Sequence, residues 1–172
     1  MRTTTGKLAV TASATVLAAA LGGGLAQASA PAVGSPEGPM PSSCHPANHT
    51  ARITQDASSS GHSHYRVTLT AAPGYEPCTL AGSPVDVQFS HHGVPIGLPA
   101  AGYGEQSVRV LFGPGHPAHF DIQVPDHLPS VPADEATFTL SAPGGQIPGE
   151  SAASGKLRVS EGTVVGPVKA GA

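Results

Sequence analysis

Residues 62–71, HSHYRVTLTA, show most clearly how this chain folds. The apolar residues of this stretch fall at every second position, namely Tyr65, Val67, Leu69 and Ala71. Polar side chains occupy the positions between them. Because successive side chains of a β-strand point to opposite faces, this period of two gives one apolar face and one polar face. The stretch therefore predicts a strand that is buried on one side.

The same alternation recurs along the rest of the chain. It is found at 50–55, where it is weakest, and at 85–91, 107–112, 118–124, 136–142 and 156–168. Turn sequences rich in Gly and Pro, such as APGYEP and GPGHP, separate these stretches. The pattern predicts an all-β fold, specifically an antiparallel immunoglobulin-like β-sandwich of about seven to eight short strands. A closed barrel is the alternative.

The N-terminal segment has the pattern of an export signal. Arg2 and Lys7 precede an apolar run at 8–25, and small residues follow at 26–30. This order of charge, apolar run and small residues is typical of secretory signal peptides, with cleavage expected after Ala28. A retained membrane anchor is the alternative, but the run is rich in Ala, Gly and Thr and has no basic flank on its far side. We therefore expect a secreted, extracellular protein without a stable membrane anchor.

The remaining segments differ in composition. Residues 29–43 contain four prolines and two glycines and few bulky apolar side chains, so they predict a disordered leader after the signal peptide at 1–28. A single β-sandwich domain is expected at 44–168, followed by a C-terminal tail at 169–172. The formal net charge is −3, and Lys and Arg are scattered singly, so the sequence does not predict nucleic-acid binding. The expected partner is an unknown extracellular or cell-surface protein, and no cofactor is expected.

The chain has two cysteines, Cys44 and Cys78. The residues next to Cys78, such as Glu76 and Pro77, provide no base or positive charge that would favour a reactive thiolate. The two cysteines also do not form a C-x-x-C motif for redox chemistry or zinc. In an oxidising compartment they have one intramolecular pairing, so a structural Cys44–Cys78 disulfide is predicted.

Motifs around the second cysteine resemble a known family. PCTLAGSP at 77–84, GVPIG at 93–97 and GPGHPAHF at 113–120 are similar to elements of the secreted actinobacterial family called domain of unknown function 4232 (DUF4232). The resemblance covers about 44–168. Ser83 replaces the aromatic residue usual in the family, and a further cysteine pair found in many members is missing. The resemblance implies an exported all-β domain with a Cys44–Cys78 bond and supplies no catalytic residues.

The nine histidines raise an alternative function. Several occur in pairs, including His91-His92, and two histidines two residues apart on a strand share one face, as a Zn(II) or Cu(II) site requires. The candidate metal ligands are His62, His64, His116 and His119. Surface histidines that bind no metal physiologically are the competing interpretation, since no H-E-x-x-H motif is present.

The sequence offers little support for an enzyme. GESAASG at 149–155 has the wrong spacing for a serine-hydrolase elbow, and carboxylates such as Asp121 and Asp134 occupy outward or loop positions. We therefore expect a non-enzymatic exported β-sandwich protein with a structural or interaction role at or outside the cell surface. Extracellular metal binding through surface histidine pairs is the alternative.

Overall fold

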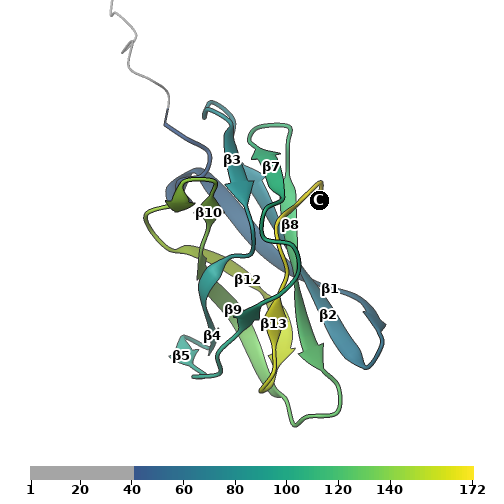
Figure 1. Cartoon of the computed structure of the whole chain (residues 1–172). Helices are drawn as coiled ribbons and strands as arrows, with labels where there is room; N and C mark the ends of the chain where they lie inside the picture. Colours follow the sequence, from purple (N-terminus) through teal and green to yellow (C-terminus); the bar gives the residue numbers. More distant parts are fainter. Residues whose placement is uncertain (1–40) are drawn as a thin grey trace, which may run out of the picture. The chain divides into compact units, whose positions relative to one another are not determined.

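The computed structural model describes residues 41–172 (Figure 1). The expected signal peptide and residues 29–40 of the expected leader lie outside this range. Apart from a 3-10 turn at Pro46–Asn48, the regular structure is β, which confirms the all-β class. The longer strands are β1 (His49–Ser59), β2 (His62–Ala71), β4 (Val85–His91), β8 (Ala118–Pro125), β9 (Val131–Thr139) and β12 (Ser151–Val159). The shorter strands are β3 (Cys78–Ala81), β5 (Val94–Pro95), β6 (Ala101–Gly102), β7 (Arg109–Phe112), β10 (Ser141–Ala142), β11 (Gly145–Gln146), β13 (Val164–Val165) and β14 (Lys169–Ala170).

The stretch 62–71 forms β2, as its alternation predicts. It pairs antiparallel with β1 on one side and with β8 on the other. Val67 lies opposite both Ile53 of β1 and Phe120 of β8, and these three side chains are at most 4% exposed. One face of the three strands is therefore part of the core, while the other face carries the polar side chains.

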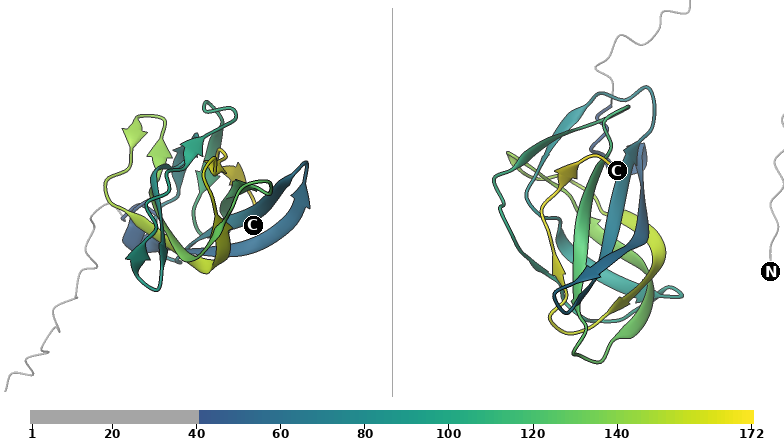
Figure 2. Two further views of the ribbon diagram at one scale, coloured as in Figure 1. Left: turned by 90° about the horizontal axis from the view of Figure 1, so that it is seen from below. Right: turned by 90° about the vertical axis from the view of Figure 1, so that its right-hand side faces the viewer.

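Ten strands form one sheet. The two views of Figure 2 show that this sheet is curled. The order across this sheet is β5-β4-β9-β12-β1-β2-β8-β13-β6, and β14 also pairs with β8. The first and last strands in the order, β5 and β6, belong to one short segment, residues 94–102. The sheet therefore curls far enough for a single stretch of chain to contribute to both of its edges. Within residues 41–172, no helix has the length and apolar character of a membrane span.

The expectation of a purely antiparallel sheet is wrong at two places. β1 pairs parallel with β12, and β13 pairs parallel with β6. At the first of these pairs, Gly155 has a φ of +153°, and a Cβ on this residue would lie 2.2 Å from the carbonyl oxygen of Ile53. Only glycine allows the two strands to approach so closely here. Alternation in sequence shows which side chains share a face but not the direction of the neighbouring strand, so the parallel pairs were not predictable from it.

The folded part extends beyond the expected bounds of 44–168 at both ends. The backbone amide of Ser43 donates to the carbonyl of Glu76, and the amide of Glu76 donates to the carbonyl of Pro41. At the other end, β14 takes Lys169 and Ala170 of the expected tail into the sheet beside β8. Backbone hydrogen bonds therefore hold residues that the sequence assigns to the leader and to the C-terminal tail.

The core lies between the curled sheet and a separate β3–β7 pair. All four phenylalanines of the chain are buried to 2% exposure or less, and the rings of Phe120 and Phe138 meet edge to face with centroids 5.0 Å apart. Leu80 of β3 and Phe112 of β7 are fully buried and close the core from the second side. The short strands β3 and β7 thus complete a core that the curled sheet alone would leave open.

The structure joins Cys44 to Cys78, the pairing expected from the sequence. Cys44 is 5% exposed, and Cys78 begins β3. The bond therefore ties the start of the domain to the strand pair that closes the core.

Replacing both cysteines with alanine is expected to lower the free energy of unfolding by about 3–4 kcal/mol, because the unfolded chain regains the entropy of an open loop. The loop in question spans 34 residues. Urea denaturation of both proteins, followed by circular dichroism, measures the difference. Dithiothreitol should lower the denaturation midpoint of the unaltered protein and leave that of the double variant unchanged. An unaltered protein that does not respond to the reductant would contradict this role for the bond.

His49 is a buried titratable group next to this bond. Its Nδ1 lies 3.0 Å from the carbonyl oxygen of Ser43, its Nε2 lies 3.0 Å from Ser151 Oγ, and its ring packs edge-on against Phe112. Burial lowers the pKa of His49 below its ordinary value of 6.5, and hydrogen bonds from the imidazole to the Ser43 and His45 backbone oppose this shift only in part. The folded protein therefore favours the neutral ring.

Stability is expected to fall as the pH decreases below about 6.5, because the unfolded chain then takes up a proton that folded His49 resists. His49→Gln should make the free energy of unfolding less dependent on pH between pH 7 and pH 5. His45 is exposed, so His45→Gln is the matched control and should keep the original dependence. Denaturation curves at several pH values test this, and equal slopes in the unaltered protein and His49→Gln would refute it.

Candidate functional site

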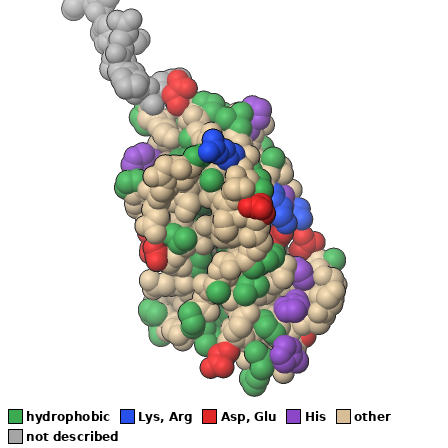
Figure 3. Space-filling model, in the orientation of Figure 1, with side chains coloured by type: hydrophobic (Ala, Val, Ile, Leu, Met, Phe, Trp, Pro, Cys, Tyr) green, Lys and Arg blue, Asp and Glu red, His purple; other side chains and the backbone are tan. Residues whose placement is uncertain are grey.

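The four predicted metal ligands lie at separate places. His62 and His64 are at the start of β2, His116 is in the turn between β7 and β8, and His119 is near the start of β8. His64 pairs with Gln123, whereas His119 pairs with Thr68, so four residues of strand, about 13 Å, separate these two histidines. In Figure 3, several histidines lie on the lower right side of the face shown, near the β1–β2 hairpin, and others lie in its upper part.

Three of these histidines already contact neighbouring groups. His62 Nδ1 is 3.1 Å from the carbonyl oxygen of Ser60, and His64 Nε2 is 3.1 Å from Ser59 Oγ. His119 is buried to 9% exposure, and its Nδ1 donates to the carbonyl oxygen of Gly171 at 3.0 Å. The structure therefore does not bring His62, His64, His116 and His119 together as a metal site.

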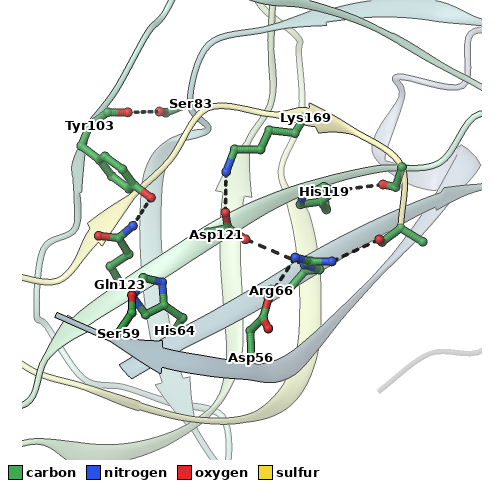
Figure 4. Close-up of polar contacts among 12 residues, drawn as sticks. Asp56, Ser59, His64, Arg66, Ser83, Tyr103, His119, Asp121, Gln123 and Lys169 are labelled. Carbon is green, nitrogen blue, oxygen red and sulfur yellow. Dashed lines mark hydrogen bonds and ion pairs between the residues drawn. The ribbon is translucent and has the colours of Figure 1, made fainter. Parts of the chain in front are cut away.

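The outer face of β1, β2 and β8 instead carries a set of paired charges (Figure 4). Arg66 forms an ion pair with Asp56 at 2.9 Å and lies 3.9 Å from Asp121, which also pairs with Lys169 of β14 at 2.7 Å. The Ala57 amide and then Arg66 hold the pKa of Asp56 below its usual value. Each charge has a partner of opposite sign, so this set joins neighbouring strands.

Tyr103 extends the polar contacts at the edge of this face. Its hydroxyl accepts a hydrogen bond from Gln123 Nε2, and its backbone carbonyl accepts one from Ser83 Oγ (Figure 4). The same carbonyl also accepts a hydrogen bond from Gln106 Nε2. Burial raises the pKa of the Tyr103 hydroxyl, and the negative charge of Asp121 adds to the effect. The hydrogen bond from Gln123 holds the loop that carries Tyr103 to β8.

A different cluster forms where β4 turns into β5. His91 ends β4 opposite Val94, and His92 and Gly93 make the two-residue turn between the strands. Both turn residues have positive φ angles, +51° for His92 and +76° for Gly93, as a type I′ hairpin requires. Histidine adopts this left-handed conformation more readily than most non-glycine residues, although still at a cost.

Asp134 of β9 meets this turn from the neighbouring strand. Both of its carboxylate oxygens accept from the backbone amide of His92, at 3.1 and 3.0 Å. Its Oδ2 also lies 3.2 Å from His91 Nδ1 and 3.6 Å from His92 Nδ1. Among residues 41–172, these three are the only group of at least three His, Cys, Asp or Glu side chains with potential metal-binding atoms within 4.8 Å of one another.

The His91-His92 pair is visible in the sequence, but its link to Asp134 is not. Adjacent residues on a regular strand point to opposite faces, so consecutive histidines do not suggest a shared site. The tight turn changes this geometry and brings the two rings to a centroid distance of 4.1 Å. The sequence signal that could have found the cluster is the dipeptide His-Gly between two alternating stretches, which is compatible with a two-residue hairpin.

A shallow, largely open apolar groove of about 520 Å³ adjoins the cluster. It is lined by His91, His92, Val94, Pro95, Ile96, Val131 and Pro132. Two of these side chains are large, apolar and exposed, Val94 by 66% and Val131 by 42%. The end of the β4–β5 hairpin therefore combines two imidazoles, a carboxylate and an apolar groove on one part of the surface.

The family model described as domain of unknown function (DUF4232) matches residues 44–169. This match agrees with the resemblance carried by the motifs around Cys78. No curated protein and no solved structure gives a significant match.

Replacing His92 with glycine is expected to raise the free energy of unfolding by about 0.5–1 kcal/mol, because glycine adopts a φ of +51° without steric cost. The neighbouring His91 lies on a strand and has no positive φ, so His91→Gly is the control and should lower the stability. Urea denaturation measures both changes. A lower stability for His92→Gly than for the unaltered protein would show that the imidazole makes compensating contacts.

Proposed function

The chain belongs to the DUF4232 family, and we propose that it is an exported, non-enzymatic protein that acts by binding another protein at or outside the cell surface. The pattern of residues 1–28 supports export, and the motif resemblance supports an actinobacterial source. The Cys44–Cys78 bond supports an oxidising location, because disulfides persist in secreted proteins and are rare in reducing compartments.

The finer description of the fold is also a proposal. We infer a distorted immunoglobulin-like sandwich, in which the β3–β7 pair faces part of the curled sheet across the core. The burial of Leu80 and Phe112 against that core supports this assignment. The two parallel pairs are then local departures from the antiparallel pattern.

The observation that carries the proposed function is the groove beside the β4–β5 hairpin. Charged residues make up 11% of the chain, well below the quarter or so common in globular proteins, and they are sparse on the face shown in Figure 3. Recognition by such a surface depends mainly on apolar and uncharged contacts. Val94 and Val131 supply exposed apolar area at one place, and a concentration of this kind is typical of interaction sites.

The groove suits the side chain of a partner better than an added β-strand. Pro95 ends β5 and has no amide hydrogen to offer to another strand. β5 is also two residues long, which limits edge-to-edge pairing with a second copy of the chain. We therefore propose that the occupant is a bulky apolar side chain on a partner protein, packed against Val94, Ile96 and Val131.

Photo-cross-linking tests this proposal. The photoreactive amino acid p-benzoylphenylalanine replaces Val94, and the protein is irradiated in native extracellular fluid. We expect a discrete cross-linked product with one other protein, and at least a several-fold loss of that product when Val131→Asp is added. Leu111 is 52% exposed and belongs to β7, so the same probe at position 111 is the matched control. Circular dichroism verifies that each variant is folded.

Three outcomes would contradict the proposal. They are an absence of products from position 94, the same products from positions 94 and 111, and products that Val131→Asp does not reduce. A product consisting of two copies of this chain would assign the groove to self-association and overturn the assignment of a different partner.

A further inference from the structure

We propose that His91, His92 and Asp134 bind a divalent transition-metal ion of the zinc class. This inference goes beyond the proposed binding of a partner protein and does not rest on it. The donor set is two imidazole nitrogens and one carboxylate oxygen, and this combination suits Zn²⁺. Three protein ligands leave one position of a tetrahedral site for water or another donor.

The ligand atoms already have the spacing that a small ion needs. With metal–ligand distances of 2.0–2.1 Å, the corners of a tetrahedron are about 3.3–3.4 Å apart. Oδ2 of Asp134 is 3.2 Å from His91 Nδ1 and 3.6 Å from His92 Nδ1. Both separations agree with the tetrahedral value to within about 0.3 Å, and potential ligand atoms of all three residues lie within 4.8 Å of one another.

His91 Nδ1 provides a second observation that points to a ligand. This nitrogen is buried and has no aligned hydrogen-bond partner, although a carboxylate oxygen lies 3.2 Å away. A buried polar atom without a partner is costly, and two electron-rich atoms face each other unless a cation lies near both. A metal ion satisfies His91, His92 and Asp134 together, whereas a proton on His91 satisfies only one contact.

The surrounding structure fixes the ligands in place. The amide of His92 donates to both oxygens of Asp134 and thereby orients the carboxylate, as groups around metal ligands commonly do. The pairing of β4 with β9 places Asp134 beside the end of β4. The His92 side chain is 80% exposed, so a hydrated ion can reach the site from solvent.

The His92 backbone is consistent with a functional role. A left-handed conformation is costly for histidine, and glycine would adopt it freely. Strained residues of this kind tend to occur where a side chain is needed for binding or catalysis. An imidazole at this turn position is explained if it supplies a ligand.

Isothermal titration of the untagged protein with zinc chloride at pH 7.5 tests the proposal. We expect one ion per chain with a dissociation constant of about 10 μM or tighter. Three substitutions remove a ligand with little change in shape: His91→Gln, His92→Asn, which tolerates the left-handed turn, and Asp134→Asn, which keeps an acceptor for the His92 amide. Each should weaken zinc binding about tenfold or more.

The double variant His62→Gln/His64→Gln is the matched control, because it removes two surface histidines that the structure does not join to a third ligand. It should bind zinc as the unaltered protein does. Thermal unfolding gives a second readout, since an ion that binds the folded state raises the melting temperature. Excess zinc should raise this temperature in the unaltered protein and in the control, and much less in Asp134→Asn.

The proposal is overturned if zinc does not bind, if the three substitutions leave the affinity unchanged, or if the His62/His64 double variant loses binding to the same extent. A different result would be that the unaltered protein does not bind zinc, while the free energy of unfolding depends less on pH in Asp134→Asn than in the unaltered protein. This would show that a proton alone bridges His91 and Asp134. That result would also overturn the metal site.

Discussion

The parallel pairing of β1 with β12 is the contact on which the rest of the structure depends. In the order of the large sheet, this pair is the single link between the strands β5, β4, β9 and β12 and the strands β1, β2, β8, β13 and β6. The hairpin cluster lies on the first set and the paired charges lie on the second. Gly155 makes the link possible, because any side chain at this position would collide with the carbonyl of Ile53. One glycine therefore permits the strand pairing that joins the two halves of the large sheet.

The sequence predicts the individual strands well and their arrangement poorly. The alternation in 62–71 identifies β2 and its buried face because that information is local. The direction of β12 beside β1 depends on contacts between residues about a hundred positions apart, which a period of two does not encode. The ends of the domain show a related limit. Composition assigns 41–43 to a disordered leader, and the alternating pattern ends before 169–172, but partners distant in sequence hold residues of both segments in the fold.

The histidines show why the candidate site was harder to predict than the disulfide. Two cysteines allow one intramolecular pairing, so composition was enough to identify the partners. Nine histidines allow many groupings, and the choice depends on the register between strands. His62 and His64 share a strand, as expected, yet the β2–β8 register places His119 four residues further along from His64. His91, His92 and Asp134 come together because a type I′ turn departs from strand geometry and because β9 is the neighbour of β4.

The β4–β5 hairpin shapes the edge of the sheet, the His/Asp cluster and the apolar groove with few residues. Its two-residue turn and Pro95 keep the edge of the sheet short, which protects it from pairing with other chains. The same turn directs two imidazoles towards Asp134 and leaves Val94 exposed on the rim of the groove. His91 and His92 line that groove and also belong to the proposed metal site, so an ion held by them would fix one wall of the groove. A bound ion would then order the hairpin before a partner docks. The hairpin would lose less conformational entropy on docking, so the partner would bind at a lower entropic cost. Neither proposal requires the other, but the shared hairpin would couple metal binding to the binding of a partner.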